Sequence, residues 1–273
     1  MKISILVCAL LGSVFCLNTW AADTSTQSWD KRFTLRAGAI AYDMTGEFSN
    51  NKKDQPKKKV DMDDLGLEDD AVEITLGATL RVGQRWRLRF DYFRYSDEAN
   101  KRVEKDFDFN GVIIPVGGTL DSSLDIDLYV TNLSYDIYRS EKAYFGIGLG
   151  VHVADFDLDV SGEGTVGGLE TGPRNGGTSL TAPLPNLYAG GIYAFRDDLL
   201  FNYGGGWMSM SYGDYDGDLI FARGALEYWP HKNIGVGAGY SYISVDVDYE
   251  TNKKKETYDV DMPGPVVYLV VGF

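Results

Sequence analysis

Apolar and polar residues alternate with a period of two along most of the chain. From Val72 to Val82 every second residue is apolar, and the residues between them are mostly polar or small. The same alternation resumes at Trp86, after the short connection Gly83-Gln84. This period predicts β-strands with one apolar and one polar face. The short connection predicts that the two strands form an antiparallel hairpin.

The pattern recurs and predicts ten strands. They span residues 32–44, 71–82, 85–97, 124–138, 143–157, 185–195, 199–212, 217–229, 234–248 and 258–273. Tight turns at 83–84, 139–142, 196–198 and 230–233 alternate with longer connections at 45–70, 98–123, 158–184, 213–216 and 249–257. Short turns on one side and long loops on the other are typical of an up-and-down barrel. Barrels of 8 or 12 strands are the alternatives.

Two classes of protein share this periodicity. In a soluble β-sandwich or barrel the apolar face points to the core, whereas in a transmembrane barrel it faces lipid and the polar face lines the lumen. Long strands favour the membrane class, as do glycine-rich inward tracts at 146–150, 204–206 and 235–239. Aromatic residues that flank the tight turns favour it too. They are Trp86, Tyr144, Tyr193, Phe195, Tyr228 and Trp229.

The C-terminus carries the most specific signal. The chain ends on Phe273, with Val267, Leu269 and Val271 at every second position before it. This segment resembles the C-terminal recognition segment of Gram-negative outer-membrane β-barrel proteins. The resemblance implies an all-β, closed, antiparallel up-and-down transmembrane barrel in the outer membrane. It also implies that these four residues are an assembly signal for the outer-membrane assembly machinery.

The N-terminus has the features of a secretory signal peptide. A basic start precedes an apolar run over residues 3–17, which is shorter than the roughly 20 residues of a transmembrane helix. We expect cleavage near Ala21/Ala22. The predicted division is a signal peptide over 1–21, a short periplasmic segment over 22–31 and the barrel over 32–273. Cys8 and Cys16 both lie in the signal segment, so we expect no disulfide in the mature chain.

The strand phase assigns a set of charged residues to the lumen. These are Arg36, Glu73, Arg81, Arg85, Arg87, Arg89, Asp91, Asp136, Arg223 and Glu227. Charges in the low-dielectric interior of a barrel are expected to pair, since isolated ones are costly to desolvate. A salt-bridged plug is therefore the favoured interpretation, and a narrow channel for small solutes is the alternative. The inward residues Val266 and Val270 argue against a wide, wet pore.

Catalytic signals are weak. Outer-membrane proteases of the omptin family use an Asp-His pair that faces an Asp pair near the outer rim. In this chain His231 falls in a short turn, and His152 has Asp155 and Asp157 nearby at a spacing that does not match. No serine-histidine motif of a lipid-modifying enzyme is recognisable. We therefore expect no enzyme activity and no cofactor, with a protease or lipid-modifying enzyme as the less favoured alternative.

Charge patterning suggests partners. The net charge of the 273-residue chain is −14, which argues against nucleic acid as a ligand. Lysines nevertheless gather in the first and last loops, which barrel closure brings to one rim. They are Lys52, Lys53, Lys57, Lys58, Lys59, Lys253, Lys254 and Lys255. They are candidates for binding lipopolysaccharide or another polyanion, and solvated loop tips are the alternative. Outer-membrane lipid is the other expected partner.

Acidic residues of the first loop give a weak metal hypothesis. Asp61, Asp63 and Asp64 begin a stretch that has six acids in ten residues, and carboxylates are hard ligands that suit Ca²⁺ or Mg²⁺. Their spacing does not match an EF-hand loop. Ion pairs with the nearby lysines are the favoured interpretation.

Two segments do not fit simple alternation. In the fourth strand Leu124, Ile126 and Leu128 set one apolar phase and Leu133 sets the other, which predicts a β-bulge near Leu128 or a segment above the membrane. In the second loop, residues 112–116 are apolar and predict either a small hairpin above the barrel or an exposed apolar patch. Together the signals predict a non-catalytic outer-membrane protein with a structural or surface-binding role.

Overall fold

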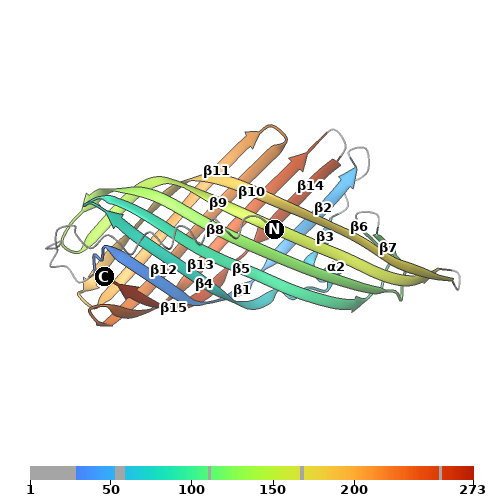
Figure 1. Cartoon of the computed structure of the whole chain (residues 1–273), viewed down its shortest axis with the longest axis horizontal. Helices are drawn as coiled ribbons and strands as arrows, with labels where there is room; N and C mark the ends of the chain where they lie inside the picture. Colours follow the sequence, from blue (N-terminus) through green and yellow to red (C-terminus); the bar gives the residue numbers. More distant parts are fainter. Residues whose placement is uncertain (1–28, 53–58, 110–111, 167–168, 252–253) are drawn as a thin grey trace, which may run out of the picture.

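Ten long strands form a closed antiparallel barrel (Figure 1). The computed structural model describes residues 29–52, 59–109, 112–166, 169–251 and 254–273. The barrel strands are β1 (Phe33–Asp43), β4 (Asp70–Val82), β5 (Trp86–Arg102), β8 (Thr119–Arg139), β9 (Ala143–Val166), β10 (Leu169–Arg196), β11 (Leu199–Tyr212), β12 (Tyr215–His231), β13 (Ile234–Glu250) and β15 (Gly264–Gly272). None of the helices in the described ranges is long and apolar enough to cross a membrane.

The first and last strands close the barrel. β1 pairs with β4 on one side and with β15 on the other, and the register sets Ala39 opposite Val267. At the end of this ladder the backbone N–H groups of Phe33 and Phe273 each donate to the other residue's carbonyl. Closure leaves no free strand edge at this level, as a bilayer requires.

One half of the barrel has an apolar outer surface. Its outward side chains are large and exposed, as for Leu149 on β9 at 65% and Val72 on β4 at 75%. Aromatic side chains border this belt, with Trp86 and Tyr135 in edge contact near the tight turns and Tyr92 beside Tyr129 at the other limit. The belt is the lipid-facing surface predicted by alternation.

The apolar phase reverses in the other half, where the strands continue past Tyr129. On β8, Leu124, Ile126 and Leu128 point inward and are at most 2% exposed, while the intervening Asp125 and Asp127 lie on the outside. β8 is nevertheless one continuous strand. The prediction of a bulge near Leu128 is wrong, because the inside of this half is apolar and no change of phase in the backbone is needed. The register shift in β8 lies between Asp136 and Tyr138 instead.

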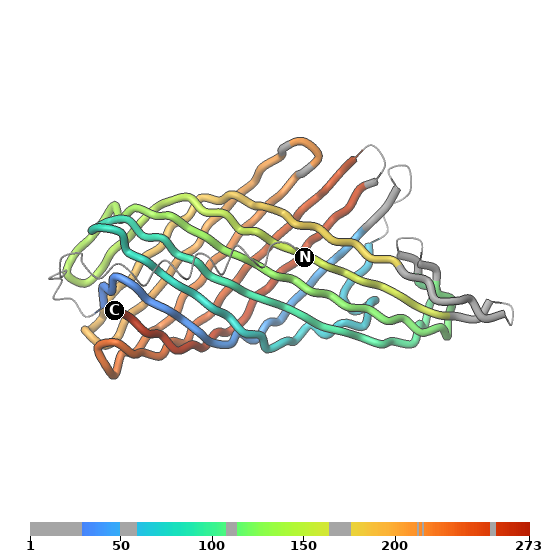
Figure 2. The backbone as a smooth tube through the Cα atoms, in the orientation of Figure 1, coloured from blue at the N-terminus to red at the C-terminus, as the bar shows by residue number. Residues whose placement is uncertain are grey.

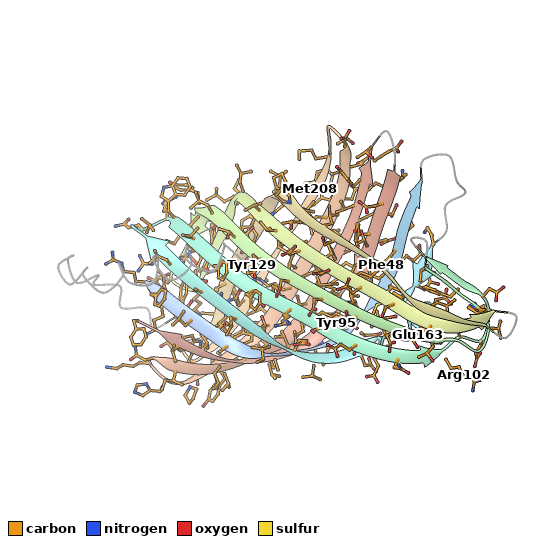
Figure 3. The ribbon with its side chains drawn as sticks, turned by 45° about the vertical axis from the view of Figure 1, so that its right-hand side comes forward. Phe48, Tyr95, Arg102, Tyr129, Glu163 and Met208 are labelled. Carbon is orange, nitrogen blue, oxygen red and sulfur yellow. The ribbon has the colours of Figure 1, made fainter. Side chains whose placement is uncertain are left out.

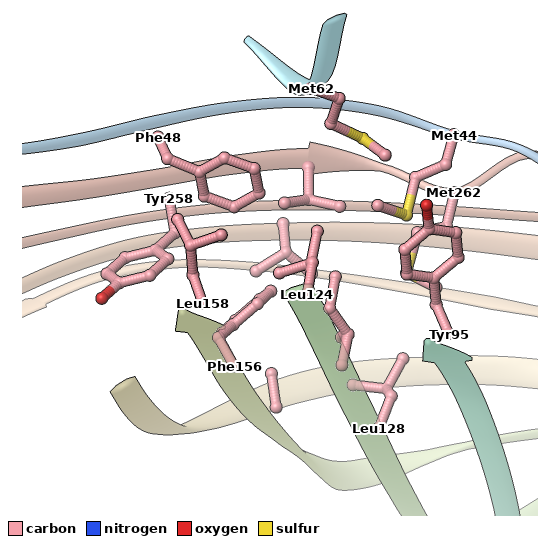
Figure 4. Close-up of a cluster of buried hydrophobic side chains, with 14 of the residues drawn as sticks. Met44, Phe48, Met62, Tyr95, Leu124, Leu128, Phe156, Leu158, Tyr258 and Met262 are labelled. Carbon is pink, nitrogen blue, oxygen red and sulfur yellow. The ribbon is translucent and has the colours of Figure 1, made fainter. Parts of the chain in front are cut away.

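This outer half consists of two sheets that face each other. One sheet is the upper part of β5, β8, β9 and β10; the other is β3 (Val60–Asp61), β2 (Thr45–Lys52), β14 (Lys254–Asp261), β13, β12 and β11. Their inner faces enclose an apolar core that includes Phe48, Tyr95, Phe156, Leu158 and Tyr258 (Figure 4). Figure 3 shows how far this half reaches, with Arg102 and Glu163 near its far end. We refer to it below as the extension.

The third predicted loop, residues 158–184, is mostly strand. β9 has 24 residues and β10 has 28, and the two pair along most of their length as a long hairpin (Figure 2). The expectation of a long loop was wrong here because inward apolar residues such as Val160 and Leu180 continue the alternation in the opposite phase. Glycines obscured this continuation in the sequence.

A seam separates β10 from β11 in the extension. Their ladder ends at the pair Leu187 and Trp207, although β10 stays paired with β9 far beyond it. Pro183 and Pro185 lie just past this point, at alternate positions of β10. Because proline has no N–H to donate and the ladder with β9 continues through both prolines, the edge that lacks donors is the one toward β11. The two prolines therefore end the β10–β11 pairing.

Short elements cover the far end. β6 (Phe107–Phe109) and β7 (Val112–Ile114) form the small hairpin that the apolar second loop predicts. The short helix α2 (Met62–Leu65) follows β3, and its Met62 and Leu65 are buried in the apolar core. Gly66 ends this helix with φ of 78°, a left-handed conformation that suits glycine.

The predicted signal peptide over 1–21 and most of the predicted periplasmic segment over 22–31 lie outside the described residues, but Trp29 and Asp30 of that segment are buried inside the barrel. Trp29 is 4% exposed and stacks on Tyr144, and the Asp30 carboxylate is fully buried. The sequence prediction missed this because a polar or aromatic residue before a strand carries no periodic signal.

Candidate functional site

The lumen at the belt level holds two clusters of charged residues. The first lies near the tight turns and centres on Asp30. Its carboxylate pairs with Arg87 at 2.9 Å, with Arg81 at 3.4 Å and also with Arg139. Arg87 in turn binds the buried Asp136 through Nε and Nη2 at 3.0 to 3.1 Å. Together with Trp29, this plug cluster occupies the end of the lumen near the tight turns.

The second cluster lies at mid-height and centres on Asp91. Arg89 Nε donates to Asp91 Oδ2 at 2.6 Å, Arg223 Nη1 donates to the same oxygen at 2.8 Å, and Arg36 Nη2 lies 3.5 Å from Oδ1. The four come from β1, β5 and β12, and barrel closure brings them together. A Cβ on Gly77 would lie 2.7 Å from Asp91 Oδ1, so a glycine at this position leaves room for the carboxylate. We refer to these four residues as the arginine chamber.

Glu227 lies next to the arginine chamber and is satisfied by neutral donors. Its carboxylate accepts hydrogen bonds from Asn202 at 3.2 Å, Trp229 at 3.1 Å and Tyr268 at 2.9 Å. Tyr268 belongs to the inward phase of the last strand. The inward face of the last strand, although mostly apolar, therefore makes one polar contact through the Tyr268 hydroxyl.

Two predicted lumen charges lie elsewhere. Arg85 is exposed in the turn between β4 and β5, where its guanidinium lies 5.9 Å from the centre of the Tyr135 ring. It is not in the lumen, because the strand phase ends at the turn. Glu73 is inward but stands apart from both clusters, opposite Ile40 in the register and near Tyr42 and Tyr95.

His152 is buried in the lumen, and within the described part of the chain its hydrogen-bond partner is an amide rather than an acid. Its Nδ1 lies 2.9 Å from Asn186 Nδ2, and its ring lies 4.5 Å from that of Phe221. Asp155 and Asp157, its neighbours in the sequence, are exposed on the outer face of β9. Alternation along the strand therefore separates the histidine from both carboxylates.

The described part of the lumen is filled at three levels. The plug cluster lies at the end near the tight turns, the arginine chamber follows it, and the apolar core occupies the extension. The cavities that remain around Arg36 and Arg89 are small, with volumes of about 50 Å³ and 30 Å³.

The lysine-rich rim is only partly described. Lys53, Lys57, Lys58 and Lys253 lie outside the described residues. The pairing of β2 with β14 sets Lys52 opposite Lys254, so the first and last loops do emerge side by side.

Two lysines of this rim have acidic partners within the protein. Lys59 hydrogen-bonds Glu47, and Lys255 lies 2.9 Å from Asp248 and 3.5 Å from Glu250. These hydrogen bonds to carboxylates raise the pKa of both lysines.

The three acids proposed as a weak metal site do not converge. Asp61 lies in β3, whereas Asp63 and Asp64 lie in α2, and Asp64 is 3.5 Å from Lys105. Within the described ranges no group of three or more His, Cys, Asp or Glu side chains is arranged to hold a metal ion.

Outward residues of the last strand are the most exposed part of the predicted assembly signal. Val267, Leu269 and Phe273 are 59%, 61% and 68% exposed, and Val271 is partly covered. The inward Val270 is buried beside Trp29 and Trp229. The two-faced character predicted for this terminus is therefore present in the structure.

Solved structures with the same architecture exist. The outer membrane protease OmpT from Escherichia coli matches with a TM-score of 0.55 at 11% identity, over 88% of this chain and 97% of that chain. The fold is that of a Gram-negative outer-membrane β-barrel. At this identity the likeness concerns the fold alone.

Other barrels match less well. The toluene transporter TodX from Pseudomonas putida has a TM-score of 0.36 at 10% identity, over 89% of this chain and 90% of that chain. Neisserial surface protein A has a TM-score of 0.33 at 13% identity, over 88% of this chain and 97% of that chain. No protein-family model and no curated protein matches the sequence.

Several residues in or beside the two clusters were not predicted as site residues from the sequence. Asp30 and Arg139 were assigned to the N-terminal segment and to a turn, and Asn202 carries no charge. The strand phase could have assigned Asn202 to the lumen, since it alternates with Phe201 and Tyr203. For Asp30 no periodic signal exists.

Proposed function

We propose that this protein is a non-catalytic, non-conducting outer-membrane protein that presents a rigid binding surface beyond the membrane. The observation that carries the proposal is the extension: two sheets with their own apolar core that continue the barrel strands past the lipid-facing belt. A packed core fixes side chains in one arrangement, which favours surface recognition. A barrel that served only as a membrane anchor would not need this core.

Two features support the absence of conduction and catalysis. The plug cluster and the apolar core fill the lumen at both ends of the arginine chamber, and water-filled pores need a continuous polar path. The buried His152 is paired with an amide rather than a carboxylate, so it lacks the partner expected of a general base.

We propose lipopolysaccharide as the partner, bound through its phosphates at the lysine-rich rim. The pairing of β2 with β14 gathers lysines of both loops at one edge of the extension. Phosphates are bound well by clustered lysines, each contributing about 1 kcal/mol near an anionic surface. Lys59 and Lys255 are expected to contribute least, because their charges are already balanced by Glu47 and Asp248.

Binding of the refolded protein to lipopolysaccharide micelles tests this proposal. A variant with glutamine at Lys52, Lys53, Lys57, Lys58, Lys253 and Lys254 is expected to bind at least ten times more weakly than the parent. The matched control is Lys59→Gln with Lys255→Gln, for which a smaller loss is expected. Unchanged binding by the six-lysine variant, or an equal loss in the control, would contradict the proposed rim site.

A further inference from the structure

The arginine chamber carries more positive charge than its acids balance. Arg36, Arg89 and Arg223 share the single carboxylate of Asp91, and the only other acid nearby among the described residues is Glu227. Three guanidinium groups and two carboxylates leave one net positive charge. Because all of these side chains are largely buried, this charge is poorly screened by solvent.

The same chamber contains donors without acceptors. Arg223 uses Nη1 to reach Asp91, but its Nε and Nη2 atoms are buried and have no hydrogen-bond partner in the described part of the chain. A buried guanidinium donor without an acceptor is unfavourable. Glu227 does not supply the acceptor, since its oxygens are taken by Asn202, Trp229 and Tyr268.

A cavity adjoins these donors. It has a volume of about 50 Å³ and is lined by Arg36, Arg89, Asp91 and Arg223 together with neutral residues such as Ser241. A single water needs roughly 10–15 Å³ of such volume. The space therefore suits a small ion with few waters, and it excludes a large organic anion.

We propose that the arginine chamber binds one small monovalent inorganic anion, of the halide class, between Arg36 and Arg223. The anion balances the net charge of the cluster and accepts hydrogen bonds from the free edge of Arg223. Its binding stabilises the closed lumen and is independent of any partner at the lysine-rich rim.

Comparing salts at equal ionic strength tests the proposal. Thermal unfolding of the refolded protein in a non-ionic detergent is measured in sodium chloride and in sodium gluconate, whose anion is too large for the cavity. The folding equilibrium constant is expected to be about tenfold higher in chloride once chloride reaches ten times its Kd. Equal unfolding midpoints in the two salts would overturn the proposal.

Two variants separate the chamber from the rest of the protein. Arg223→Gln removes the unpaired donors and is expected to abolish the difference between the salts. Arg94→Gln removes an arginine on the outer face that is paired with Asp125. This variant is expected to retain the difference in stability between the two salts. Retention of the full difference by Arg223→Gln would show that chloride binds elsewhere.

Crystals soaked in sodium bromide provide a readout that does not depend on a variant folding. We expect an anomalous bromide peak within hydrogen-bond reach of Arg223 Nε or Nη2. Density for water alone at this position, without an anomalous signal, would refute the anion site.

Discussion

Asp30 and Asp91 illustrate one arrangement used twice: a buried carboxylate that faces three arginines. Asp30 is completely buried, and Asp91 is 6% exposed. Taking such charges out of water is costly, and the cost is offset only while all partners stay in place. Each carboxylate therefore holds together strands that are far apart in the sequence.

We predict that Asp30→Asn destabilises the barrel by about 3–5 kcal/mol, because it leaves buried arginines without their counter-charge. The free energy of unfolding in urea, measured in detergent, checks this prediction. Asp198→Asn is the control, since Asp198 pairs with Arg196 at the surface and its loss costs about 0–1 kcal/mol. Similar values for the two variants would mean that Asp30 does not hold the plug cluster together.

At the scale of the element, a long strand such as β8 has its apolar residues on the outer face in the belt and on the inner face in the extension. In the belt the apolar residues of β8 face lipid, as Leu133 does, and in the extension they face the core, as Leu124 does. The strand itself does not change direction. The solvent around the strand changes, from lipid outside to water outside, and the apolar residues change sides with it.

The two leucines of β8 give a matched test of this change. Leu124→Ala is expected to cost about 2–5 kcal/mol, because it leaves a cavity in a packed core. Leu133→Ala is expected to cost less, because lipid or detergent fills the vacated space. Urea unfolding of both variants in the same detergent is the measurement. A larger loss of unfolding free energy for Leu133→Ala than for Leu124→Ala would contradict the assignment of Leu124 to the core and of Leu133 to the lipid-facing surface.

At the scale of the whole molecule, charged and apolar side chains occupy the described part of the lumen. Residues from nearly every strand meet in the lumen, and the two sheets of the extension close above them. The cavities around Arg36 and Arg89 measure about 50 Å³ and 30 Å³, and a larger one of about 310 Å³ lies in the extension beside Lys101 and Phe107. The seam between β10 and β11 opens the wall of the extension alone, since the strands are paired below Leu187.

We predict that the refolded protein shows no conductance steps in planar lipid bilayers, because the plug cluster and the apolar core occupy the described part of the lumen. Single-channel recording with a porin as positive control is the measurement. Heat-modifiable mobility on gels checks that the inserted protein is folded. Steady, reproducible steps from folded protein would instead favour the narrow channel.

The sequence by itself determined the local structure. Period-two alternation and tight turns predicted the ten strands of the barrel, and the terminal segment from Val267 to Phe273 predicted its class. These features depend on residues close together in the chain, where side-chain direction follows from backbone geometry alone. The strand phase likewise predicted Arg36, Asp91 and Arg223 as lumen residues.

Only the tertiary structure decided which residues meet. The length of β9 and β10 and the inward direction of Leu124 depend on whether water or lipid surrounds the strand, which alternation does not encode. The burial of Asp30 depends on three arginines, which β4, β5 and β8 contribute. The grouping of Arg36, Arg89 and Arg223 around Asp91 arises only when β1 and β12 are brought round by closure, because pairing between distant strands is set by the whole barrel rather than by any one segment.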